Sequence, residues 1–128
     1  MNAPLGIELH VLNRDWRQKN IDWKPFSIDG RQQVQISRLY DDCIDGVGPV
    51  AALVKYLPGA VVPAHQHQGS ELILVVEGEL IDDEGVYGEG TMKIYAPGSV
   101  HALSSTTGCV FLVVWEQPVM RVQGIGAP

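Results

Sequence analysis

Residues 59–78 read GAVVPAHQHQGSELILVVEG, and this stretch decides most of what the sequence predicts about fold and chemistry. His65 and His67 are two positions apart, so on a β-strand both side chains point to the same face. Glu71 begins the next apolar run after a short Gln-Gly-Ser connection and can present its carboxylate to the same point. The stretch therefore predicts two strands that bring three potential metal ligands together.

A fourth potential ligand, His101, follows a Pro97-Gly98 turn and must arrive from a different hairpin. Three imidazoles and one carboxylate, with no thiolate, disfavour a closed structural zinc site. The set suits one Fe(II), Mn(II), Ni(II) or catalytic Zn(II) ion, and six-coordination leaves positions for water or substrate. A His-x-His pair alone is more often a surface alternation, but the glycines and prolines that flank this one favour a metal site.

Short β-type runs separated by Gly, Pro and Asp continue on both sides of this stretch. The period-two alternation predicts strands at 33–40, 50–57, 71–77, 80–81, 91–95, from about 100, and at 109–116. Pro58-Gly59 is expected to end the second strand, and residues 82–85 to form a solvated hairpin turn. The pattern predicts an all-β protein, a barrel or sandwich of the jelly-roll type.

The chain is expected to be a single domain, 1–128, with a β-barrel core at 33–120. The first 32 residues are less regular and are expected to form a flap or edge segment. The residues expected to pack on the barrel or on a partner subunit are Trp16, Trp23, Pro25 and Phe26.

Composition excludes several functions. The net charge of −6, with scattered Lys and Arg, argues against binding to nucleic acid or to an anionic membrane. The longest apolar run, 109–115, is too short to cross a bilayer, and the N-terminus does not read as a signal peptide. Two isolated cysteines, Cys43 and Cys109, suit a reducing compartment. A cytoplasmic location is the expectation.

These residues resemble the cupin superfamily. The first cupin motif, Gly-x5-His-x-His-x3-Glu-x6-Gly, is matched in full within residues 59–78. The second, Gly-x5-Pro-x-Gly-x2-His-x3-Asn, is matched at Gly90, Gly98 and His101. Ala96 stands where that motif has proline and Ser105 where it has asparagine, so the residues around the metal ligands depart from the pattern there.

Within the cupins, residues 58–115 look like the ChrR-like subgroup, with Glu77-Gly78-Glu79-Leu80-Ile81-Asp82-Asp83 and Gly108-Cys109 among the matching segments. The resemblance implies a single RmlC-like jelly-roll barrel with an N-terminal extension. It also implies one divalent metal per chain held by His65, His67, Glu71 and His101. Cupins host many activities, so the fold alone does not give the function.

The first functional hypothesis is a non-haem metal-dependent dioxygenase. The chain is similar in length and layout to small single-cupin enzymes of the acetylacetone-cleaving type, which implies Fe(II) and a small diketone or ketone substrate. Glu71 would be a fourth ligand or, as in some cupins, a base near the substrate. Alternation along the strands predicts that the substrate pocket is lined by Ile73, Met92, Ile94 and Phe111.

The alternative is a non-catalytic cupin that binds or senses a small molecule through its metal. ChrR-type anti-sigma factors carry such a domain behind a helical zinc-binding segment. Residues 1–45 contain only His10 and Cys43 as candidates for that zinc site, so binding to a sigma factor is disfavoured. Because cupins commonly pair through sheet edges, a homodimer is expected.

Overall fold

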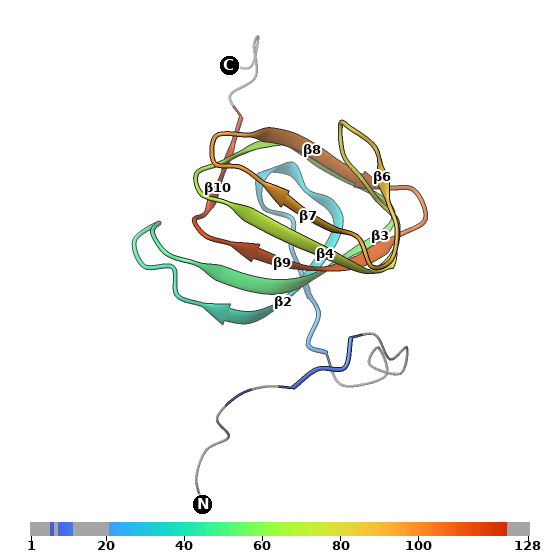
Figure 1. Ribbon diagram of the computed structural model, residues 1–128, viewed down its shortest axis with the longest axis horizontal. Helices are drawn as coiled ribbons and strands as arrows, with labels where there is room; N and C mark the ends of the chain where they lie inside the picture. The colour runs from blue at the N-terminus through green and yellow to red at the C-terminus, as the bar shows by residue number, and fades with distance from the viewer. Residues whose placement is uncertain (1–5, 7, 12–20, 123–128) are drawn as a thin grey trace, which may run out of the picture.

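The structure is a computed structural model that describes residues 6, 8–11 and 21–122. Trp16 lies outside the described residues. Nearly all of the regular structure is β, joined into one curled antiparallel sheet (Figure 1). Its elements in chain order are β1 (Lys24–Pro25), the 3₁₀ turn η2 (Ile28–Gly30), β2 (Gln32–Asp41), β3 (Val50–His67), β4 (Glu71–Gly78), β5 (Leu80–Ile81), β6 (Val86–Tyr87), β7 (Met92–Tyr95), β8 (Val100–Ser105), β9 (Cys109–Trp115) and β10 (Val119–Arg121).

Strand β3 organises the sheet because it belongs to both of its layers. Its first half pairs with β2 and β9, and its second half pairs with β8 and β10. The expectation that Pro58-Gly59 ends this strand is wrong. The chain stays extended through both residues, with Gly59 at φ +85°, and changes partners there instead of turning back. A positive φ costs glycine little, which explains its place at the bend.

The two layers diverge from β3. One continues through β9 and β4 to β7, and the other through β8 and β5 to β6. Figure 1 shows the sheet curling until these layers face each other, with β8 along one side and β4, β7 and β9 along another. This is the all-β jelly-roll barrel that the strand spacing predicts.

The core fills the space between the layers with the inward-facing residues of each strand. Alternating burial along β4 places Ile73 and Val75 inside, where they pack against Phe111 of β9 and Ile36 of β2. A second cluster, centred on Leu53, lies on the other face of the sheet.

The N-terminal segment covers part of that outer face. Trp23 packs on the second cluster together with Leu9, Val11 and Ile21, and β1 is an edge strand paired with β2. Phe26 packs instead against the barrel core. Among the described residues, no helix reaches the length and hydrophobicity that crossing a membrane would require.

Candidate metal centre

Four potential ligands converge at one end of the barrel. His65 and His67 lie at the end of β3, and His101 of β8 is the direct cross-strand partner of His65. Glu71 is the first residue of β4, in the opposite layer. One ligand atom from each residue lies within 4.8 Å of the others, and all four residues are between 2% and 6% exposed. The structure therefore brings together the complete set that the sequence predicts.

Hydrogen bonds at the outer ring nitrogens fix the orientation of two imidazoles. Nδ1 of His65 lies 3.1 Å from the carbonyl oxygen of Pro63, which can only accept. Nδ1 of His67 lies 2.8 Å from Oγ of Ser99, whose own proton is donated to the carbonyl of Ala96 at 2.6 Å. Both Nδ1 atoms must therefore carry a proton, so both Nε2 atoms present lone pairs.

These lone pairs face other acceptors. Nε2 of His67 is buried and lies 3.1 Å from Oε2 of Glu71. Nε2 of His65 lies 2.8 Å from Nε2 of His101, which is 3.5 Å from Oε1 of Glu71. Acceptor atoms this close in a buried site need a proton or a cation between them. Two imidazoles with inward lone pairs, a third imidazole and a carboxylate fit one divalent metal ion.

Electrostatics keep these groups in the forms that bind metal. Burial and the neighbouring imidazoles His65 and His67 lower the pKa of His101 to about 4. Burial also lowers the pKa of His65, although Glu71 opposes the change. Burial raises the pKa of Glu71, but its contact with His67 and the attraction of the other imidazoles outweigh this and leave that pKa lowered. Near neutral pH the lowered pKa values favour neutral imidazoles at His65 and His101 and a carboxylate at Glu71.

Glu71 is held from behind by Trp115. The indole Nε1–H of Trp115 donates to Oε2 of Glu71 at 2.7 Å, and the two residues are direct partners in the β4–β9 register. The sequence predicts a strand over Trp115 but indicates no role for its side chain. The pairing of β4 with β9 is a long-range event, so no local pattern reveals the contact.

Replacing Trp115 with phenylalanine should weaken metal binding by about tenfold, because loss of a partner that orients a ligand typically costs about 10- to 100-fold in affinity. The change keeps an aromatic ring and removes the N–H donor. Metal affinity can be measured by competition with a chromogenic chelator. Trp23→Phe is the matched control, since Trp23 packs on the other face of the sheet. Equal affinities in the two variants would show that the indole hydrogen bond does not position Glu71.

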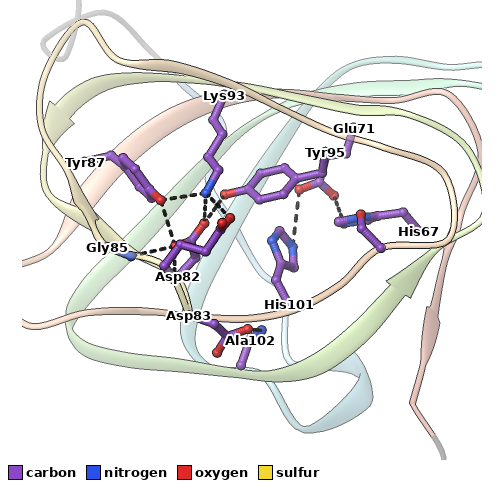
Figure 2. Close-up of polar contacts among 12 residues, drawn as sticks. His67, Glu71, Asp82, Asp83, Gly85, Tyr87, Lys93, Tyr95, His101 and Ala102 are labelled. Atoms are coloured by element: carbon purple, nitrogen blue, oxygen red, sulfur yellow. Dashed lines mark hydrogen bonds and ion pairs between the residues drawn. The ribbon is translucent and has the colours of Figure 1, made fainter.

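A polar network lies behind His101, and Figure 2 shows it beside the ligands. The Tyr95 ring packs edge-on against His101, with ring centroids 4.2 Å apart. Its hydroxyl donates to Oδ2 of Asp82 at 2.9 Å, and Lys93 Nζ donates to the same oxygen at 2.5 Å. The expectation that residues 82–85 form a solvated turn is thus wrong for Asp82, whose side chain is 1% exposed.

Asp82 is buried because it gathers donors from several segments. Its Oδ1 accepts the backbone N–H groups of Glu84 and Gly85 and the hydroxyl of Tyr87. Because Tyr95 joins this carboxylate to the His101 ring, the network supports one wall of the ligand cluster. The run of acidic residues at 82–84 hides this role, since only Asp82 turns inward.

The four residues expected to line a substrate pocket divide into two pairs. Ile73 and Phe111 are buried inside the barrel, at 1% and 2% exposure. Met92 and Ile94 are 58% and 64% exposed, so the expectation that they line an interior pocket is wrong. Along β7 the more buried positions are Lys93 and Tyr95, and Met92 and Ile94 alternate with them on the exposed side. In a strand, shifting the alternation by one residue moves every side chain to the other face.

The two departures from the second cupin motif leave the ligands in place. Ala96 accepts the hydroxyl proton of Ser99 through its backbone carbonyl, a role that needs no proline. Ser105 donates to the carbonyl of Glu79 at 2.6 Å and links β8 to the segment between β4 and β5. Cys109 is buried as expected of a core residue, and burial raises its pKa to about 12.

Comparison with known proteins places this geometry in a family. Residues 16–119 match the family described as the ChrR cupin-like domain. No curated protein matches the sequence significantly. Solved structures give many matches, all those described below being under 25% identical, and such likeness shows the fold alone.

A chain in the crystal structure of Rhodobacter sphaeroides SigE in complex with the anti-sigma ChrR is 23% identical, with a TM-score of 0.62. The match covers 75% of this chain and 49% of that one, so the present chain accounts for about half of the length it matches. The polyketide cyclase RemF from Streptomyces resistomycificus is 24% identical, with 84% of each chain covered and a TM-score of 0.66.

An acetylacetone dioxygenase from Acinetobacter johnsonii is 11% identical, with 100% of this chain and 83% of that chain covered and a TM-score of 0.75. The likeness in fold thus spans both protein types that the sequence resembles, and the family match covers most of the sequence. Together with the jelly-roll topology and the buried cluster of His65, His67, Glu71 and His101, the match shows that the chain belongs to the ChrR cupin-like domain family.

Proposed function

We propose that this cupin is a mononuclear non-haem metal-dependent dioxygenase that acts on a small diketone or ketone, with Fe(II) as its metal. The observation that carries the proposal is the orientation of the ligands. His65 and His67 aim unprotonated Nε2 atoms at the position that Glu71 and His101 also face. A set of three imidazoles and one carboxylate leaves positions in six-coordination for a substrate and dioxygen.

The chain's own residues would prepare this site for oxidation chemistry. The three histidines and Glu71 would hold the ion, which when bound supplies Lewis acidity and redox chemistry toward dioxygen. Glu71, held by Trp115, is proposed as a fourth ligand in preference to a free base, because its two oxygens already face imidazole nitrogens. The apolar walls formed by Phe111 and its neighbours would exclude bulk water.

The alternative is a binding or sensing cupin whose metal only holds the ligand. The family match favours this reading, since the family is named for ChrR and a ChrR complex is among the similar structures. We do not propose binding to a sigma factor, because residues 1–45 contain only His10 and Cys43 as candidate ligands for the zinc site of such a segment.

Oxygen uptake separates the two proposals. The protein is loaded anaerobically with Fe(II), and oxygen consumption is followed after addition of acetylacetone as the probe. The dioxygenase predicts uptake that depends on both iron and the diketone, with one dioxygen consumed for each diketone. His101→Ala should abolish uptake, because a ligand is lost. Bound iron with no diketone-dependent uptake would overturn the dioxygenase and favour the binding or sensing cupin.

A further inference from the structure

A surface groove leads towards the metal centre. The groove has a volume of about 240 Å³, and its apolar walls include Ile28, Val50 and Pro118. The cavity of about 20 Å³ beside His65 and Glu71 lies deeper. Phe26, Arg31 and Trp115 line both spaces, so they form the boundary between them.

Arg31 stands at this boundary with most of its donors unused. Its side chain is 7% exposed, yet among the described residues it donates one hydrogen bond, from Nη1 to the carbonyl of Ile28 at 3.0 Å. Its guanidinium packs over the Phe26 ring at 4.5 Å from the centroid. A guanidinium has five N–H donors, and none of the Arg31 nitrogens is both fully buried and without a partner, so those that make no hydrogen bond still reach the spaces that the side chain lines. The buried position is therefore suited to an incoming acceptor.

The charged groups around Arg31 leave a place for an anion. Asp29 lies 3.8 Å away but is 43% exposed, so solvent screens this pair. Asp29, Arg38 and Asp41 also line the groove, and Asp41 lies 3.7 Å from Arg38 and is 46% exposed. With a divalent ion bound, the ion, Glu71 and Arg31 would together carry a net charge of two positive units. A buried positive charge of this size favours an anionic ligand.

We propose that Arg31 is the anion-recognition residue of this site, and that its ligand is a small organic monocarboxylate whose apolar part lies in the groove against Phe26 and Trp115. Guanidinium and carboxylate groups match in a planar, two-bond geometry. The cavity has room for only about one water-sized group, whereas the groove can hold a compact apolar body. The proposal names the ligand class of the proposed metal site and in that sense rests on the proposed function.

The test uses benzoate and its neutral isostere benzamide, titrated into the zinc-loaded protein by calorimetry. Benzoate should bind on the order of 10- to 100-fold more tightly than benzamide, as expected for a charge-assisted hydrogen bond. Arg31→Gln should reduce this preference to near onefold, and Arg31→Lys should keep part of it. Lys24→Gln is the control, because the Lys24 side chain is 70% exposed and lines neither the groove nor the cavity.

Equal binding of benzoate and benzamide by the parent protein would overturn the proposal, and this comparison needs no variant to fold. Failure of both probes to bind would overturn it as well. So would a preference for benzoate that survives in Arg31→Gln. Zinc content and thermal unfolding are measured for every variant, so that loss of metal or of folding is recognised.

Oxygen uptake is scored separately. Uptake without a benzoate preference would remove the anion site and leave the dioxygenase. A preference for benzoate that depends on Arg31, without oxygen uptake, would keep the anion site and overturn the dioxygenase.

Discussion

Replacing His67 with alanine should remove nearly all of the metal that the protein carries through purification. His67 is buried, and its Nε2 atom lies 3.1 Å from Oε2 of Glu71, so the substitution removes one of the four ligands from a closed site. Loss of a partner behind a ligand already costs about 10- to 100-fold in metal affinity, and loss of the ligand itself should cost on the order of a hundredfold or more. Elemental analysis of parent and variant measures the effect.

His10→Ala provides the matched control. His10 has an exposed side chain and bonds only to Glu8 among the described residues, so its loss should leave the metal content unchanged. If His67→Ala and the parent carried equal metal, the assignment of the ligands would be wrong. If both histidine variants lost metal to the same extent, the metal would be bound at the surface.

Replacing Asp82 with asparagine should lower the free energy of unfolding by about 2–4 kcal/mol. The carboxylate is buried and accepts hydrogen bonds from Tyr87, Tyr95 and Lys93 as well as from two backbone N–H groups. An amide of the same shape offers one acceptor oxygen in place of two and leaves Lys93 without its buried counter-charge. Urea unfolding of the metal-free proteins measures the difference.

The same pair of proteins should lose its stability difference in acid. The partners of Asp82 outweigh the effect of burial and lower its pKa from 3.8 to about 2. A carboxyl group with a lowered pKa in the folded state stabilises the fold above its unfolded pKa and stops doing so as pH falls through the folded value. The difference should therefore be constant above about pH 4 and shrink between about pH 4 and pH 2.

Asp83→Asn is the control for both measurements, because Asp83 is exposed and adjacent and undergoes the same chemical change. Its effect should stay within about 0.5 kcal/mol, apart from a small contribution from its hydrogen bond to the backbone N–H of Ala102. Equal destabilisation by the two substitutions would show that the buried network around Tyr95 does not stabilise the fold.

The sequence predicts the strands and the ligand cluster well because both depend on short-range spacing. His65 and His67 must share a face of any strand that contains them, and a turn of three residues leaves Glu71 little choice of position. His101 is harder to place from spacing alone, and the motif that precedes it supplies the missing information. In the structure it pairs directly with His65.

What the sequence does not predict depends on long-range register. Met92 and Ile94 look like inward residues because they are apolar, but the phase of β7 is set by Tyr95, which bonds to Asp82. The contact of Trp115 with Glu71 requires knowledge that β4 pairs with β9. Arg31 comes from the irregular N-terminal segment, where no periodic pattern indicates that its side chain is buried.

The central claim is that four side chains from three strands form one site for a divalent metal. The most direct test is elemental analysis of the parent protein purified without chelators and without a histidine tag. We expect close to one divalent ion per chain, and one equivalent of metal restored after removal and reloading. A protein that carries no metal and takes up none from Fe(II), Mn(II), Ni(II) or Zn(II) would contradict it.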